Sequence, residues 1–318
     1  MISIEKRNAA RDKNGQFIFK NLAFVRTAEL GSFTKAAEDL HYAQSSVSKM
    51  IADLEKEWNV LLLERDRSSV CLTSEGQRIL PLAREILNDH RRHTDTIGRM
   101  KGMETGIVRI GTFASVAIHW LPNIFAHFRK DFPGIEYEIL LGDYDEIEKQ
   151  IEDGRVDCGF LRFPTEPSWG TLLLKEDEYK VVLPQNHPLA AAESIPIEKP
   201  EGQPFLLLEH GGKTDVSELL EKYGVRPSVC FTTWEDFAIM AMAEKGLGIG
   251  ILPSLILQHI PYDIEVRPPE KPFYRKIGLA CKNKNRLLPA TRKFTEYLCF
   301  REEEKGRKEK NSEENLWN

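Results

Sequence analysis

The sequence predicts a two-part α/β chain, in which a small helical unit with a β-wing and a long helix precede a larger domain of two α/β units. Three observations predict this architecture. Short helical patterns follow one another near the N-terminus, a heptad-like pattern comes next, and strand and helix patterns alternate over the remainder. A chain of 318 residues is long enough for two or more domains, each with its own core.

The composition narrows the class of protein. Apolar residues make up 41% of the chain and no run of eighteen apolar residues occurs, so the sequence predicts a globular protein without a membrane span. The N-terminal stretch MISIEKRNAARDKNGQF is charged and lacks a hydrophobic segment, which argues against a signal peptide. The five cysteines are scattered and form no CxxC pair. We therefore expect a cytoplasmic protein with no disulfide framework, no structural zinc and no cofactor.

The charge is distributed unevenly along the chain. The net charge of −5 argues against a uniformly basic nucleic-acid-binding protein. Residues 1–105 carry 17 lysines and arginines against 15 aspartates and glutamates, a net charge of +2, whereas the remainder carries 27 against 34, a net charge of −7. This asymmetry permits DNA binding by the N-terminal part without proving it.

Two helical patterns open the N-terminal part. Residues 1–16 are polar and contain the turn signal Asn14-Gly15, so we expect them to be disordered or to be an extension from an early start codon. From Leu22 the apolar spacing is helical, up to a break at Gly31. Ser32 can cap the next helix. The inward-facing residues of that second helix are Ala36, Ala37 and Leu40.

A third helix begins within AQSSVSKMIADLE, residues 43–55, directly after the short turn HYAQ. Val47, Ile51 and Leu54 fall on one face of this helix, while its first turns are small and polar. Three helices within about 40 residues, two of them joined by a tight turn, have helix-turn-helix spacing.

A β-wing and a long helix are expected next. The apolar run, charged tip and return of NVLLLERDRSSVCLTSEG, residues 59–76, predict the wing. The long helix is expected from Thr73 to about Met100, and its heptad-like spacing predicts pairing with another helix. Pro81 predicts a bend or a later start in this helix. The spaced apolar residues are Ile79, Ile86 and Met100, with Ala83 and Ile97 on an adjacent stripe.

Strand and helix patterns alternate in the rest of the chain. This alternation predicts parallel strands with crossover helices, arranged as two α/β units that join near KVVLPQNHP, residues 180–188. The charged residues 301–318 are expected to form a tail. The expected strands are IVRIG, IEYEILL, RVDCGFLRF, EYKVVLP, PFLLLEH, SVCFTTW, LGIGILP and YRKIGLAC.

The polar front of the third helix predicts a surface that reads DNA. A helix fits the major groove, where glutamine suits adenine and lysine suits guanine or a phosphate, and short serines allow a close approach. The alternative is an ordinary polar helix start, which explains any one of these residues but not their combination with the tight turn and the wing. The candidate DNA contacts are Thr34, Lys35, Gln44, Ser45, Ser46, Ser48, Lys49, Arg65 and Arg67.

The stretch SFTKAAEDLHYAQSSVSKMIADLEKEWNVLLLERDRSSVCLTSEG resembles the winged helix-turn-helix of LysR-type transcriptional regulators, with the pattern SFTxAAxxLxxxQxxVSxxIxxLE and then LTxxG. Asn59 departs from the usual glycine but tolerates a left-handed backbone. Lys49 departs from the usual arginine, so base preference there is open. The matching residues are Ser32, Phe33, Thr34, Ala36, Ala37, Leu40, Gln44, Val47, Ser48, Ile51, Leu54, Glu55, Val60, Leu62, Arg65, Leu72, Thr73 and Gly76.

The resemblance implies a sequence-specific transcription regulator and not an enzyme. Its second part would be an effector-binding domain of two subdomains, resembling periplasmic binding proteins, with a small-molecule effector between them. The implied partners are double-stranded promoter DNA, the effector, a second copy paired through the linker helix, two further copies in a homotetramer, and RNA polymerase. The effector, the target genes, and whether the protein is an activator or a repressor stay open.

The candidate effector contacts follow predicted strands that would face one another. Ser115, in GTFAS, matches the family's common effector-contacting position, and Arg162 could pair with a carboxylate. Each has a simpler alternative: Ser115 could cap its helix, Arg162 could pair with a surface acid, and His210 could be a core histidine. The candidates are Thr112, Ser115, Asp143, Arg162, His210, Gly211 and Trp234.

Among these candidates, Asp143 differs from the family pattern, which often has threonine at this position. An aspartate that faces the site would repel an anionic effector and select a cation. The favoured interpretation is that Asp143 caps the helix YDEIEKQ instead.

Two other classes of protein fit the sequence less well. An enzyme is disfavoured because GLGIG, residues 246–250, is not GxGxxG and precedes a strand, and because no GxSxG, HExxH or P-loop occurs. His90 and His93 form only a weak metal spacing beside two arginines. A solute-binding receptor is disfavoured by the N-terminal motif.

The expected domain boundaries follow from these assignments. Residues 17–75 form the DNA-binding domain, 76–102 the linker and dimerisation helix, and 106–300 the effector-binding domain, before the tail at 301–318. Within the effector-binding domain, the first subdomain is expected at about 106–180 and 266–300, and the second at about 181–265.

Overall fold

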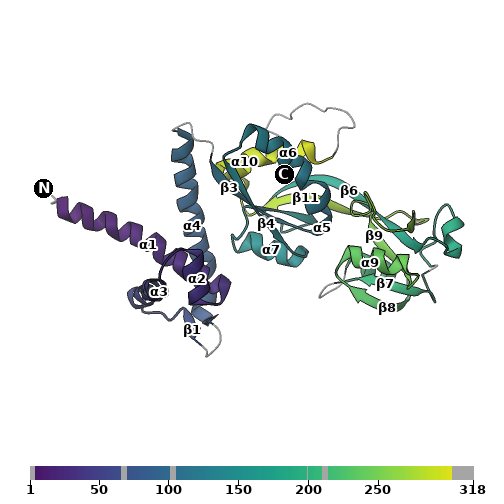
Figure 1. The fold of residues 1–318 in the computed structure, drawn as a ribbon, viewed down its shortest axis with the longest axis horizontal. Coiled ribbons are helices and arrows are strands. Elements are labelled where there is room, and N and C mark those ends of the chain that lie inside the picture. The colour runs from purple at the N-terminus through teal and green to yellow at the C-terminus, as the bar shows by residue number, and fades with distance from the viewer. Residues whose placement is uncertain (1–3, 66–69, 101–104, 199, 210–213, 303–318) are drawn as a thin grey trace.

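The computed structural model describes residues 4–65, 70–100, 105–198, 200–209 and 214–302. Within those ranges, no helix has the length and apolar character needed to cross a bilayer. Figure 1 shows three bodies in a row: a helical unit, the helix α4, and a two-lobed α/β domain. The tip of the predicted wing, the end of the linker and residues 303–318 of the predicted tail lie outside the described residues.

The N-terminal unit is a helix-turn-helix with a two-stranded wing. Its elements are α1 (Ile4–Leu30), α2 (Phe33–Asp39), α3 (Gln44–Trp58), β1 (Leu63–Arg65) and β2 (Val70–Leu72). Ser32 caps α2 as predicted, since its hydroxyl accepts the Lys35 N–H at 3.3 Å. Asn59 ends α3 with a left-handed backbone at φ 52°, the conformation that its side chain tolerates.

One apolar core holds this unit together. Val47, Ile51 and Leu54 of α3 are at most 1% exposed, as their spacing predicts. They pack with α1 and α2 in a single cluster that also receives Leu80 and Ala83 of α4. The helix-turn-helix unit therefore shares its core with the start of α4, so the two are packed as one body.

Two expectations for the helices are wrong. The turn expected at Asn14-Gly15 is absent, because α1 continues through both residues. A glycine inside a helix costs only about 1 kcal/mol relative to alanine, which a long helix tolerates. A late start of the linker helix is also wrong: α4 (Ser74–Met100) begins one residue after Thr73 and contains Pro81 within it. Thr73 contributes at this start, since its Oγ1 accepts the Gly76 N–H at 2.9 Å.

The two-lobed domain is built on one nine-stranded sheet in the order β4-β3-β5-β11-β6-β9-β7-β8, with β10 paired to β6. Its strands are β3 (Gly106–Thr112), β4 (Ile135–Leu141), β5 (Cys158–Phe163), β6 (Gly170–Pro184), β7 (Pro204–Leu208), β8 (Ser228–Thr233), β9 (Ile249–Pro253), β10 (Ile264–Arg267) and β11 (Tyr274–Cys281). Its α-helices are α5 (Ala114–His119), α6 (Leu121–Asp131), α7 (Tyr144–Glu152), α8 (Asp215–Lys222), α9 (Asp236–Glu244) and α10 (Pro289–Glu296). Short 3₁₀ turns lie at Pro188–Ala191, Lys284–Arg286 and Tyr297–Arg301.

The parallel strand pairing expected for this domain is found in only part of the sheet, which is mixed. The pairs β3–β4, β3–β5, β7–β8 and β7–β9 are parallel, as the alternation of strands and helices predicts. The strands β6, β10 and β11 pair antiparallel with their neighbours. The sequence interpretation also missed two elements of this domain, the strand β10 and the helix α10.

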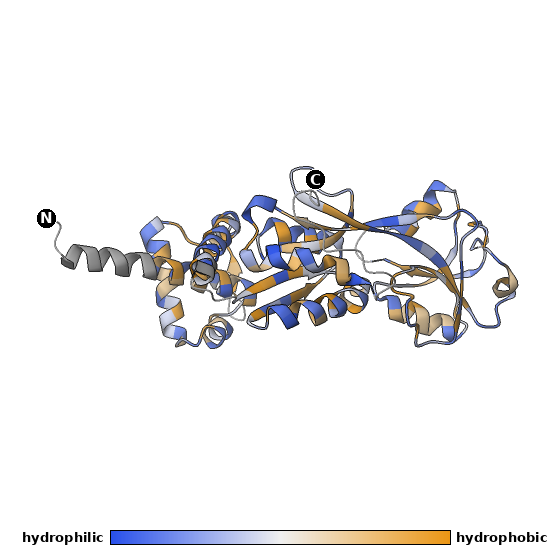
Figure 2. Ribbon diagram, turned by 90° about the horizontal axis from the view of Figure 1, so that it is seen from above, coloured by the Kyte–Doolittle hydropathy of each residue, from blue (hydrophilic) through white to orange (hydrophobic). Residues whose placement is uncertain are grey.

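The long strand β6 belongs to both lobes: the first lobe also contains β3, β4, β5 and β11, and the second contains β7, β8, β9 and β10. Its first residues, Gly170 to Glu178, pair with β11, and its last residues pair with β9 and β10. Figure 1 shows this strand running from one lobe to the other. Figure 2 shows both hydrophobic and hydrophilic residues on the helices of the first lobe, as expected for helices that cover a sheet, whereas α9 (DFAIMAMAE) is mainly hydrophobic. The lobes therefore meet along strands, and side chains at this crossing can contact both.

Candidate functional site

The polar side of α3 is exposed, and the opposite, apolar side of this helix is buried in the core. Thr34, Lys35, Gln44, Ser45 and Lys49 are exposed, and Ser46 and Ser48 are partly exposed. Ala43, at the N-cap of α3, provides no side-chain acceptor for the first N–H groups of that helix. An uncapped helix N-terminus of this kind suits a phosphate.

The wing is fastened to α3 through Glu55. The Glu55 Oε1 accepts the N–H groups of Leu62 and Leu63 at 2.8 and 3.1 Å. The Thr73 hydroxyl donates to the Leu61 carbonyl at 2.7 Å, which fastens the base of the wing to α4. Arg65 ends β1, but its side chain and the whole of Arg67 lie outside the described residues. The proposed contacts of these two arginines stay predictions.

A buried arginine contacts several polar side chains where the two lobes meet. Arg275 of β11 is 6% exposed, and its guanidinium lies 2.7 Å from the carboxylate of Asp177 in β6. It also donates to the Ser115 hydroxyl at 2.9 Å and to the Tyr144 hydroxyl at 3.0 Å. Ser115 therefore does not serve as a helix cap, since Phe113 occupies the N-cap of α5 and Ser115 contacts Arg275.

A second ion pair joins one lobe to the other. Arg162 of β5 donates to Asp215, the first residue of α8, and lies over the Tyr144 ring at 5.7 Å. The Tyr179 hydroxyl of β6 donates to the same Asp215 carboxylate at 2.5 Å. Burial raises the pKa of both Tyr144 and Tyr179, so both phenols stay protonated: Tyr144 accepts from Arg275, and Tyr179 donates to Asp215. We call this set of residues the inter-lobe junction; it comprises Ser115, Tyr144, Arg162, Asp177, Tyr179, Asp215 and Arg275.

The remaining candidate effector contacts are not part of the inter-lobe junction. Asp143 caps α7, with its carboxylate accepting the Glu146 N–H at 2.7 Å, which is the favoured interpretation of the sequence. Thr112 is fully buried. Trp234 is 66% exposed. His210 and Gly211 lie outside the described residues.

Sequence reasoning missed Arg275, Asp177, Tyr144, Tyr179 and Asp215. A signal for two of them was present in strand alternation. Arg275 shares a strand face with the buried Ile277 and Leu279, and Asp177 shares one with the buried Val181 and Leu183. Because side chains alternate along a strand, a charge in register with a buried face requires a partner.

One further acid lies near this arginine. The pKa of Asp236, in the first turn of α9, is raised to about 6 because burial penalises its carboxylate, while the positive charge of Arg275 opposes the rise. An acid with a raised pKa binds more protons in the folded than in the unfolded chain. The folded state therefore loses stability as the pH rises toward 6, and this loss persists at higher pH.

Because the ionised Asp236 carboxylate destabilises the folded state, removing its charge should stabilise the protein at neutral pH. Asp236→Asn should raise the free energy of unfolding near pH 7.5 by about 1–3 kcal/mol, since one pKa unit corresponds to about 1.4 kcal/mol, and should change little near pH 4. Denaturant unfolding at the two pH values measures the difference. Asp263→Asn, at an exposed acid of the same lobe, is the control. An equal effect of Asp236→Asn at both pH values would contradict the prediction.

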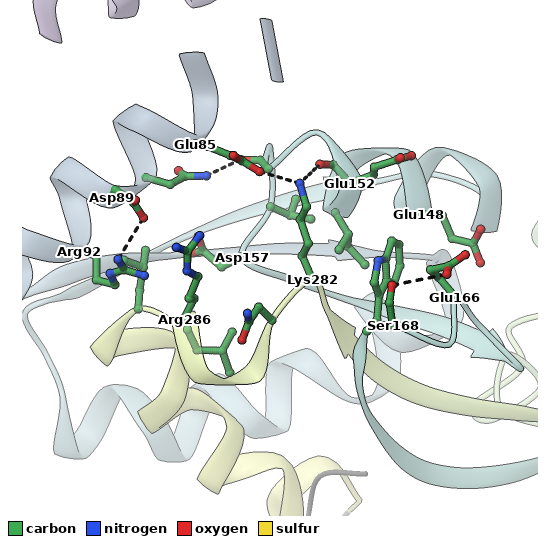
Figure 3. A pocket seen from close by; sticks show the side chains of 18 residues that line it. Glu85, Asp89, Arg92, Glu148, Glu152, Asp157, Glu166, Ser168, Lys282 and Arg286 are labelled. Atoms are coloured by element: carbon green, nitrogen blue, oxygen red, sulfur yellow. Dashed lines mark hydrogen bonds and ion pairs between the residues drawn. The ribbon is translucent and has the colours of Figure 1, made fainter. Parts of the chain in front are cut away.

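A separate cavity of about 670 Å³ lies between α4 and the first lobe (Figure 3). Its lining is rich in charge, and Lys282 bridges Glu85 of α4, at 2.7 Å, and the Glu152 carbonyl of α7, at 3.2 Å. Arg92 pairs with Asp89 along the same helix at 3.2 Å. The Lys282 contacts dock α4 on the first lobe, whereas the Arg92–Asp89 pair lies within α4. No cluster of three metal-ligating side chains occurs in the described part of the chain, and His90 and His93 are exposed.

Comparisons with known proteins agree with this geometry. The family model described as "Bacterial regulatory helix-turn-helix protein, lysR family" matches residues 22–77, and the "LysR substrate binding domain" matches residues 101–299. The probable HTH-type transcriptional regulator LrrA of Synechococcus elongatus is 33% identical over 85% of this chain and 92% of its own length. The uncharacterised regulator YvbU of Bacillus subtilis is 30% identical over 86% of this chain and 94% of its own length.

Solved structures share the fold. A full-length OxyR variant from Pseudomonas aeruginosa has a TM-score of 0.71 at 23% identity, covering 89% of this chain and 93% of its own. Full-length CbnR in complex with its target DNA has a TM-score of 0.64 at 21% identity, covering 89% of this chain and 98% of its own.

Proposed function

Since this chain belongs to the LysR family of DNA-binding transcription regulators with an effector-binding domain, we propose that α3 reads operator DNA and that the inter-lobe junction receives the effector. The observation that supports the first part is the exposed polar front of α3 over a fully buried back face. The observation that supports the second part is Ser115, a serine 2% exposed whose hydroxyl is held by Arg275 where the lobes meet.

The proposed operator complex contains more than one copy of the chain. Leu82 and Ile97 of α4 are 57% and 39% exposed, and they lie beside the heptad-spaced Ile86. Apolar residues exposed on one helix favour pairing with a second helix, which would place two α3 helices on a dyad-symmetric site about one helical turn apart. We propose a homodimer through residues 76–100, a homotetramer built from two such dimers, contact with RNA polymerase, and action in the cytoplasm.

The DNA-reading proposal has a direct test in Lys49. Lys49→Ala should weaken binding to a duplex selected from a random library by the full chain, by about 1–3 kcal/mol if the ammonium contacts a base. The control is Lys56→Ala, which removes the same charge from the exposed last turn of α3. A gel shift measures both affinities. If both variants lose the same amount of DNA affinity, Lys49 does not contact a base and contributes only through its charge.

The effector proposal is tested by Ser115→Ala. A thermal-shift screen of small metabolites against the full chain first identifies a stabilising compound. Ser115→Ala should then bind this compound about 10-fold more weakly, because one hydrogen bond to a charged or polar ligand group is lost, and should keep its affinity for DNA without the compound.

The matched control is Ser168→Ala, at an exposed serine in the lining of the 670 Å³ cavity beside α4. A loss of compound binding in Ser168→Ala but not in Ser115→Ala would move the effector site from the inter-lobe junction to that cavity. The effect on DNA binding would be allosteric only if the compound binds two arrangements of the chain with different affinity.

A further inference from the structure

A second, smaller cavity lies where the DNA-binding unit, the linker helix and the effector domain meet. Its volume is about 240 Å³, and its walls come from α1, α4, the neighbouring strands β3 and β4, and the turn after α7. Figure 1 shows α4 standing between α1 and this edge of the effector domain. The cavity exists only while these parts are docked on one another.

Guanidinium groups dominate the lining of this cavity. The five arginines are Arg26, Arg84, Arg91, Arg109 and Arg155, against two glutamates, Glu29 and Glu138. Arginine is the side chain best suited to oxyanions, because its planar group presents several N–H donors to carboxylate or phosphate oxygens. The composition of the lining therefore points to an anionic ligand.

Three buried guanidinium nitrogens have no hydrogen-bond acceptor within the described part of the chain: Arg84 Nε, Arg84 Nη1 and Arg91 Nη1. The side chain of Arg84 is only 7% exposed. Its Nη1 lies 3.1 Å from Asp153 without hydrogen-bond geometry, and Arg91 Nη1 lies 3.8 Å from Asp157. Buried donors without an acceptor are unfavourable, so an oxyanion among them would be stabilised by several charge-assisted bonds.

Carboxylates around the cavity neutralise part of this charge. Glu29 pairs with Arg26 and Arg84, at 3.0 and 3.2 Å, and Glu138 pairs with Arg109 at 2.5 Å. Arg26 also donates twice to the carboxylate of Asp39, at 2.7 Å in each case. Each guanidinium has five N–H groups, and these pairs use only some of them. Arg155 is exposed and forms no ion pair with the described residues. Donors therefore remain for a further anion.

We propose that this cavity binds a small multivalent oxyanion, with inorganic phosphate as its simplest representative, and that the bound anion holds the DNA-binding unit and linker helix against the effector domain. The volume of about 240 Å³ is below the usual range of sites for drug-sized ligands and leaves room for a small oxyanion together with water. Because the walls come from three parts of the chain, the anion binds only the docked arrangement and shifts the population toward it. This site is separate from the inter-lobe junction, so it does not depend on the effector proposal.

The test is an isothermal titration of the full chain with inorganic phosphate at constant ionic strength. The expected result is saturable binding of one phosphate per chain, weakened about tenfold or more in Arg155→Ala, which breaks no ion pair among the described residues. Arg129→Ala, at an exposed arginine of α6 outside the cavity, should bind phosphate as the unchanged chain does. Sulfate should compete with phosphate, whereas chloride should not.

Hydrogen exchange supplies the second readout. Phosphate should slow amide exchange around residues 84–91 and 153–155, on the two sides of the docked contact, and this slowing should be absent in Arg155→Ala. Non-saturable binding, or equal phosphate affinity in Arg155→Ala and Arg129→Ala, would overturn the proposal. Phosphate bound at the start of α3 would give that second result, since Arg155 lines this cavity and is not part of α3.

Discussion

Arg275→Ala is expected to lower the free energy of unfolding by about 3–5 kcal/mol, because it leaves a buried carboxylate without its counter-charge. The side chain of Asp177 is fully buried, and besides its pair with Arg275 it accepts the backbone N–H of Leu255 at 2.9 Å. The substitution also removes the donors to Ser115 and Tyr144. Effector binding at the inter-lobe junction should be lost together with stability. Denaturant unfolding and the thermal-shift response to the effector measure the two losses.

Two further variants separate the buried ion pair from a general charge effect. Lys276→Ala removes a positive charge from the next residue, which is exposed and lies 3.5 Å from Glu176, and should change stability by less than about 1 kcal/mol. The double variant Arg275→Met, Asp177→Leu replaces both charges by apolar groups and should recover most of the stability. A single Arg275→Ala variant as stable as Lys276→Ala would show that the pair makes no large contribution.

Gly76→Ala is expected to destabilise the DNA-binding unit by about 3 kcal/mol, at the upper end of the usual cost of overpacking. A Cβ atom at this position would lie 2.1 Å from the Leu62 carbonyl oxygen and 3.0 Å from its carbon. These are backbone atoms at the base of the wing, which Thr73 and Glu55 already hold by hydrogen bonds. The backbone cannot move aside without breaking those bonds, so the clash should separate α4 from the wing.

Hydrogen exchange of the α2 and α3 amides, together with operator affinity, measures this effect. Both protection and affinity should fall in Gly76→Ala, while the effector domain keeps its protection because it has a separate core. The control is Ser74→Ala, at an exposed position in the same turn of α4. Unchanged protection of α2 and α3 in Gly76→Ala would mean that the base of the wing adapts to the methyl group.

Much of the N-terminal unit could be predicted from the sequence because its structure depends on local patterns. The cap at Ser32, the buried face of α3 and the left-handed residue Asn59 each follow from a few neighbouring residues. The exposed polar front of α3 follows from the same periodicity. The family resemblance rests on this stretch for the same reason. The failure at Asn14-Gly15 shows the limit, since a weak local turn signal did not interrupt α1.

The effector domain shows what local patterns leave open. Most strands and helices were found where predicted, yet the antiparallel pairing of β6, β10 and β11 was not. Strand direction depends on which segments meet in space: β10 and β11 follow one another along β6, and both run antiparallel to it. The helix α10 was missed although it packs its Phe294 into the first lobe.

The sequence by itself determined the winged helix-turn-helix, its exposed polar face, the linker helix and the alternation of strands and helices, since all of these are periodic patterns over a few turns or residues. Only the tertiary structure decided that Arg275 pairs with Asp177, 98 residues earlier, and that Arg162 meets Asp215 across the two lobes. Such pairs depend on strand register and on how the lobes pack. A charged residue at a position that the sequence pattern predicts to be buried requires a partner of opposite charge. Only the fold determines which residue is close enough to be that partner.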